Sequence, residues 1–146
     1  MNNPPTRVSA TATRTLCTLL AMVGWSGLAL QLDLVLLARW TSGASVLGGL
    51  VNYFSFFTIL TNTLAAVVLT CEATGRESGV RRFFLQPRIS SGVCVSIIVV
   101  GVAYSVLLRN LWQPQAYQWM GKEMLHQVMP IRFALYWSFC VQKGAL

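Results

Sequence analysis

The stretch Asn52-Tyr-Phe-Ser-Phe-Phe-Thr-Ile-Leu-Thr-Asn62 lies at the centre of the longest uncharged run of the chain, from Trp40 to Cys71. A run of this length predicts a membrane-spanning helix. Its centre is nevertheless polar, because Ser55, Thr58 and Asn62 fall on one stripe of a helix that turns about 100° per residue. Lipid offers no hydrogen-bond partners, so such a stripe must be satisfied by other helices, by water or by a ligand.

The composition indicates an integral membrane protein. Of 146 residues, 55% are hydrophobic and only 10% are charged, whereas soluble domains contain about 25% charged residues. The net charge of +7 could suggest a nucleic-acid partner. The basic residues, however, lie mostly between the apolar segments and do not form a run or a face. This distribution is typical of residues that set membrane topology. Nucleic-acid binding is therefore not expected.

Four apolar segments predict an all-α membrane protein, a bundle of four transmembrane helices at about 15–38, 48–70, 89–108 and 123–142. A polar leader, 1–14, precedes this transmembrane domain, 15–146. Lysine and arginine are more frequent in the leader, the connection 72–88 and the C-terminal end than in the other connections. This bias predicts a cytoplasmic N-terminus. We expect the protein in the cell (plasma) membrane as a multi-pass protein.

The chain after the third segment is less regular. Trp112, Tyr117 and Trp119 are amphipathic aromatic residues of the kind found at a membrane–water interface. The fourth segment contains His126, Pro130 and Arg132, each of which is costly in lipid. Polar residues inside a span usually face the bundle interior or a water-filled cavity, so we expect this segment to turn them inward.

Few residues could carry chemistry. The four cysteines are widely spaced, without a CxxC pair, and the single histidine cannot complete a Cys/His zinc set, so no metal or cofactor is expected. No two carboxylates share a helical face in a span, and no known nucleotide-binding or hydrolase motif occurs. What remains is a hydroxyl, Thr58 or Ser55, paired with the imidazole of His126 as its base.

Depth in the membrane argues against that pair. Counted from the same side of the bilayer, Thr58 lies ten residues into its span, or about 15 Å deep, and His126 three residues, or about 5 Å. The two side chains would meet only if the fourth segment began deeper or the helices tilted.

Three motifs together suggest a family. Phe54-Ser-Phe-Phe-Thr-Ile-Leu-Thr-Asn62, then Arg109-Asn-Leu-Trp-Gln-Pro-Gln115, then Leu125-His126 with Pro130 resemble the bacterial branch of the androgen-induced-protein-like (FAR-17a/AIG-like) membrane family. The resemblance extends from about Gly24 to the C-terminus. It implies a threonine-dependent intramembrane hydrolase of fatty-acyl esters, with Thr58 and His126 as the catalytic pair. The family has about six helices, so the resemblance also implies that this chain is a fragment of a longer bundle.

Two hypotheses of function follow. In the first, Thr58 attacks a fatty-acyl ester, His126 transfers the proton, and Asn62 or Ser55 donates to the oxyanion. In the second, the protein is a non-enzymatic lipid-binding or regulatory membrane protein, in which the same stripe holds a headgroup or packs helices. Membrane lipids or fatty-acyl esters are the expected partners in both. A small transporter is a weaker third reading, because the sequence offers no repeated half.

Overall fold

The computed structural model describes residues 9–108 and 123–141, without the side chains of residues 54, 55, 107 and 108. Within this part all the regular secondary structure is helical, and there is no strand. The leader up to residue 8, the predicted interfacial aromatics between 109 and 122, and the last residue of the fourth predicted span lie outside the described residues.

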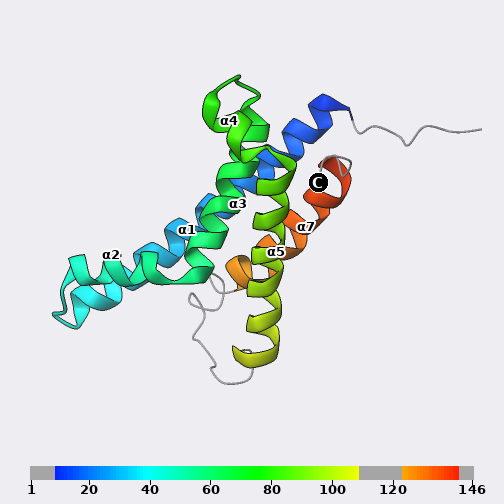
Figure 1. Ribbon diagram of the computed structural model, residues 1–146. Helices are drawn as coiled ribbons and strands as arrows, with labels where there is room; N and C mark the ends of the chain where they lie inside the picture. Colours follow the sequence, from blue (N-terminus) through cyan, green and yellow to red (C-terminus); the bar gives the residue numbers. More distant parts are fainter. Residues whose placement is uncertain (1–8, 109–122, 142–146) are drawn as a thin grey trace, which may run out of the picture.

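Up to residue 108 the helices follow one another with short connections (Figure 1). In chain order they are α1 (Ala10–Thr41), α2 (Val46–Ser55), α3 (Phe57–Thr74), α4 (Gly79–Phe84), α5 (Pro87–Ala103), the π-helical turns η1 (Tyr104–Leu108) and η2 (Met124–Val128), and α7 (Met129–Cys140).

Local sequence explains where several helices begin. The hydroxyls of Ser9, Ser45 and Ser78 each accept a hydrogen bond from the backbone N–H three residues later, which caps α1, α2 and α4. Pro87 begins α5, where its missing N–H would have had no intrahelical acceptor.

Three helices are long and apolar enough to cross a membrane: Ala10–Thr41, Phe57–Thr74 and Pro87–Val106. This is compatible with a multi-pass membrane protein, and it confirms the predicted all-helical class. The chain after Glu123 is helical as expected, but it is not among these three helices. The count of four spans therefore stays a prediction.

Two hydrophobic clusters hold the helices together. The larger contains buried residues of α1, α3, α5 and α7: Cys17, Leu20, Ala21, Ala65, Val68, Leu69, Val93, Cys94, Ile97, Met129, Phe133 and Tyr136. The smaller joins α1, α2, α3 and η2 through Leu28, Tyr53, Ile59, Ala66 and Leu125. The smaller cluster lies directly beside the polar stripe, so α2 and η2 are both fixed around it.

The predicted second span is broken within its central motif. Phe56 has an extended backbone (φ −76°, ψ 123°) that ends α2 and starts α3, and Figure 1 shows the chain changing direction there. The sequence prediction of one unbroken helix over 48–70 was wrong at this point. Every residue from Asn52 to Thr58 has a low helix propensity. Together these residues allow the helix to break even though the segment contains no Gly or Pro.

Several polar side chains link the helices in the way that interhelical hydrogen bonds do in membranes. The Tyr53 hydroxyl donates to the Leu28 carbonyl at 2.6 Å, which joins α2 to α1. The indole N–H of Trp25 donates to the Thr70 hydroxyl at 3.1 Å, and that of Trp137 to the Ser91 hydroxyl at 3.1 Å. These links join α1 to α3 and α7 to α5.

The approach of α5 to the start of α7 depends on Gly101. A Cβ at Gly101 would lie 3.1 Å from the Cβ of Pro130 and 3.2 Å from the carbonyl oxygen of His126. Both neighbours are rigid, because one is a proline ring atom and the other is backbone. On the same helix, a Cβ at Gly92 would meet nothing within 4 Å.

Gly101→Ala should therefore lower the free energy of unfolding by about 1–3 kcal/mol, because the two helices must separate. Gly92→Ala is the matched control and should raise it by about 0.5–1 kcal/mol, because alanine is the better helix former. Unfolding of the detergent-solubilised protein in a denaturant titration measures both. Equal effects of the two substitutions would contradict close packing at Gly101.

Candidate functional site

Asn62 is the centre of the polar stripe and is completely buried. Its side-chain nitrogen donates two hydrogen bonds, to the Thr58 carbonyl at 2.8 Å and to the Leu125 carbonyl at 3.0 Å. The first bond lies within α3, and the second reaches η2, 63 positions along the chain. One amide therefore joins the start of α3 to the start of the last helix.

The Leu125 carbonyl needs this partner because of Pro130. In the π turn, the Met129 N–H bonds the carbonyl of Met124, five residues earlier. In this register the Leu125 carbonyl would accept a hydrogen bond from the N–H of residue 130. Residue 130 is proline, however, and has no N–H. A buried carbonyl without a donor is costly, and the Asn62 amide supplies the donor.

Thr58 lies in the first turn of α3 and is half-buried. Its carbonyl and that of Leu125 bind the same nitrogen, so Thr58 and the residue before His126 lie at the same level. The difference in depth estimated from the sequence is thus removed, because α3 begins at Phe57 and η2 packs against its first turns. The site pair itself is not joined: within the described residues the Thr58 hydroxyl makes no hydrogen bond to His126.

His126 is half-buried on η2, and its ring lies against that of Tyr104 on η1, with centroids 4.5 Å apart and planes tilted by 37°. The Tyr104 hydroxyl donates to Glu123 at 3.3 Å. The two π turns therefore face each other across this contact. Sequence reasoning did not find Tyr104, since nothing in the spacing links residue 104 to residue 126.

A groove of about 390 Å³ runs beside His126, between the η1 end of α5 and the first turns of α7. Its walls are mostly apolar, and its lining residues are Ile98, Gly101, Val102, Ser105, Val106, His126, Gln127, Pro130, Ile131 and Ala134. The side-chain nitrogen of Gln127 is buried and has no hydrogen-bond partner within 9–108 and 123–141. Thr58 does not line this groove.

Some of the remaining predicted residues lie where the sequence predicts, and others do not. Ser55 ends α2, but its side chain lies outside what the structure describes. The side-chain nitrogen of Asn62 donates two hydrogen bonds, and its side-chain oxygen is buried without a partner in the part of the chain that the structure describes. Asn62 therefore presents an acceptor, which disagrees with its expected role as an oxyanion donor. Pro130 is buried as expected, whereas Arg132 is exposed and does not face the interior.

The described residues contain no group of His, Cys, Asp or Glu that could hold a metal ion. The four cysteines are unpaired; Cys17 and Cys94 are buried, and Cys71 and Cys140 are half-buried. Burial in apolar surroundings is typical of unreactive structural thiols.

The fold and the site define a helical protein with membrane-compatible spans and an apolar groove that has a polar end. Comparison with protein-family models, with curated proteins and with solved structures found no match. The resemblance to the androgen-induced-protein-like family accordingly remains a prediction from the sequence motifs.

The link between Pro130 and Asn62 gives the first test of the site. Asn62→Ala should cost about 1–3 kcal/mol of unfolding free energy, because it leaves the Leu125 carbonyl buried and unsatisfied. In a Pro130→Ala background residue 130 regains an N–H, so the same Asn62→Ala change should cost about 1 kcal/mol less. Unfolding titrations of the four proteins in detergent measure this coupling.

The matched control replaces Pro130→Ala with Pro87→Ala, since Pro87 occupies a helix start where its N–H is not needed. Asn62→Ala and Pro87→Ala should be additive. Additive costs in the Pro130 pair as well would show that the missing N–H does not explain the Asn62 contact.

Proposed function

We propose that this chain is a multi-pass integral membrane protein that binds a fatty-acyl lipid in the groove beside His126. The observation that carries the proposal is the groove itself, which has mostly apolar walls and is lined by Gln127, whose buried amide nitrogen has no partner among the described residues. Ligand sites are commonly apolar clefts with a few polar groups that fix orientation. A lipid could enter this groove sideways from the bilayer, because three of the helices have the length and hydropathy of membrane spans.

The polar end of the groove favours a lipid with a hydrogen-bond acceptor. The Gln127 amide nitrogen is a buried donor on a residue that lines the groove, and a rotation of its side chain toward the groove would let an ester or carboxyl oxygen satisfy it. A plain hydrocarbon would leave the donor unpaired at a cost of about 1–3 kcal/mol. Fatty-acyl esters therefore fit the groove better than hydrocarbons do, with the acyl chain along Val102 and Ala134 and the ester near Gln127.

Hydrolysis of such an ester by Thr58 and His126 is a second candidate function, favoured by one observation. The Asn62 amide binds the carbonyls of both Thr58 and Leu125, so the proposed nucleophile and base belong to adjoining backbone segments. The reaction would require the two side chains to shift toward each other, and catalytic hydrogen bonds are often long before substrate binds. This function would be consistent with membership of the androgen-induced-protein-like family and with a plasma-membrane location, an N-terminus in the cytoplasm and a bacterial source.

In that reaction the Thr58 hydroxyl oxygen bonds the ester carbonyl carbon while its proton passes to His126. The ester C–O bond then breaks, and the protonated imidazole returns the proton to the leaving alcohol. Water hydrolyses the acyl-threonine in the same two steps. The backbone N–H groups of Phe57 and Thr58, in the first turn of α3, are suited to bind the oxyanion in place of Asn62.

Lipid binding is tested with a photoreactive fatty-acyl ester and the purified protein in detergent. Ala134→Trp should reduce labelling at least about tenfold, because the indole fills the groove, and Gln127→Leu should reduce the preference for the ester over the matching alkane. Val95→Trp is the control, since Val95 is exposed on α5 outside the groove. Undiminished labelling of Ala134→Trp would place the ligand elsewhere.

Hydrolysis is tested separately with a chromogenic fatty-acyl ester. Thr58→Ala and His126→Ala should each lower kcat by at least about 100-fold if the pair is catalytic. Thr63→Ala, on the same helix, should retain activity, because the Thr63 hydroxyl bonds only the Ile59 carbonyl. Photolabelling with no turnover, or turnover that survives Thr58→Ala, would leave the binding function and remove the enzymatic one.

A further inference from the structure

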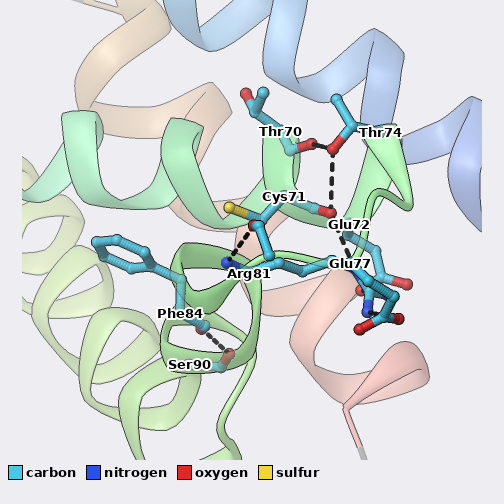
Figure 2. Close-up of polar contacts among 9 residues, drawn as sticks. Thr70, Cys71, Glu72, Thr74, Glu77, Arg81, Phe84 and Ser90 are labelled. Atoms are coloured by element: carbon cyan, nitrogen blue, oxygen red, sulfur yellow. Dashed lines mark hydrogen bonds and ion pairs between the residues drawn. The ribbon is translucent and has the colours of Figure 1, made fainter.

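The other end of the bundle, where α3, α4 and α5 meet, is organised by Arg81. Figure 2 shows its side chain between Glu72 and Glu77, below the last turn of α3. Its guanidinium lies 3.2 Å from Glu77 and 3.9 Å from Glu72, and its Nε donates to the Cys71 carbonyl at 3.3 Å. Arg81 thus holds α4 against α3 and pairs with both carboxylates of this end.

Four other arginines gather there: Arg14, Arg76, Arg82 and Arg88, which we call the basic end. All four are exposed, and within the described residues none forms an ion pair. They come from α1, from the connection after α3, from α4 and from the start of α5. Five arginines against two glutamates leave this end positively charged.

Gly75 brings the α1 arginine into the group. It has a left-handed backbone (φ +60°) after the last turn of α3, and a Cβ there would lie 2.7 Å from Cζ of Arg14. The Arg14 guanidinium therefore lies directly over the glycine. A cation in this position is favoured by the carbonyl end of the α3 dipole, and the exposed part of the guanidinium can still bind an anion.

The short helix α4 adds apolar groups beside these charges. Val80 and Phe83 are 59% and 51% exposed, and they flank Arg81 and Arg82 in the sequence. A short segment that combines exposed apolar and basic side chains is suited to the boundary between lipid headgroups and acyl chains. The basic end also lies at the ends of two apolar helices, α3 and α5, which is the level of the headgroups.

We infer that the basic end binds the phosphate groups of anionic phospholipids in the adjacent leaflet. Guanidinium groups match phosphate geometry. Arg81 pairs with the two carboxylates among the described residues of this end, so the other four arginines are not engaged by them. The inference concerns a surface distinct from the groove and does not rest on the proposed function. It also goes beyond topology, since the positive-inside bias requires charges but no lipid selectivity.

The test uses the full chain in detergent micelles, with fluorescent phosphatidylglycerol and phosphatidylcholine of equal chain length. Phosphatidylglycerol should bind at least about tenfold more tightly, and the preference should shrink as salt rises from about 50 to about 500 mM. The triple substitution Arg76→Gln, Arg82→Gln and Arg88→Gln should weaken phosphatidylglycerol binding by roughly 100-fold, at about fivefold per arginine.

Two single variants test the direction of the effect on phosphatidylglycerol binding. Arg39→Gln removes an arginine from the opposite end of α1 and should leave binding unchanged. Glu77→Gln removes a carboxylate and releases one ion pair of Arg81, so it should strengthen binding several-fold. The Glu77 side chain is 79% exposed, and this variant keeps the test decisive if the triple variant fails to fold.

Equal binding of the two lipids would overturn the inference, as would an equal loss in Arg39→Gln or weaker binding in Glu77→Gln. Complete competition by about 10 mM inorganic phosphate would also overturn it, because the surface would then be a site for a small anion. Retention of the preference against phosphate, with the expected signs in the variants, supports a phospholipid surface.

Discussion

A proline inside an apolar helix removes one backbone N–H, and in a low-dielectric bundle the carbonyl that loses its donor must find another. In this protein Pro130 has that effect on the Leu125 carbonyl, and the amide of Asn62 supplies the missing donor at 3.0 Å. The same amide bonds the Thr58 carbonyl. The depth of α7, the packing of η2 on α3 and the position of His126 all depend on this arrangement.

The π turns follow from the same constraint. A π turn widens the helix by one residue, and η2 changes the backbone register just before Pro130. Opposite it, η1 places Tyr104 against His126. The groove beside His126 is thus formed by two irregular turns and by the absence of a side chain at Gly101. Regular helices at these positions would present a different set of side chains to the groove.

The sequence predicted the helices best where one signal dominated. The third predicted span lies in a helix that begins at Pro87 and, after Arg88, is uncharged and rich in Val and Ile, as the composition required. The break at Phe56 was missed because it depends on a sum of weak propensities rather than on glycine or proline. Thr58 and Asn62 were found as polar groups of one stripe, but their place beside the last described helix was not. The contact between Asn62 and Leu125 joins residues 63 positions apart, which no local pattern encodes.

The two ends of the bundle have different chemistry. Around Arg81 the interactions are ionic and exposed, and they weaken as ionic strength rises. Around Asn62 they are neutral and buried, so salt has little access to them. Changes in the solvent therefore act mainly on one end of the molecule, and changes in the lipid act on both.

The length of α1 links the protein to the thickness of its membrane. With 32 residues it is about 48 Å long, whereas the hydrocarbon core of a bilayer is about 30 Å thick. In a bilayer the helix would therefore tilt, or its end turns, those near Arg14 and those near the exposed Trp40, would lie outside the hydrocarbon. Hydrophobic mismatch of this kind makes tilt a function of lipid chain length. Because Tyr53 of α2 bonds the α1 carbonyl of Leu28, a change in that tilt would be passed to the break at Phe56.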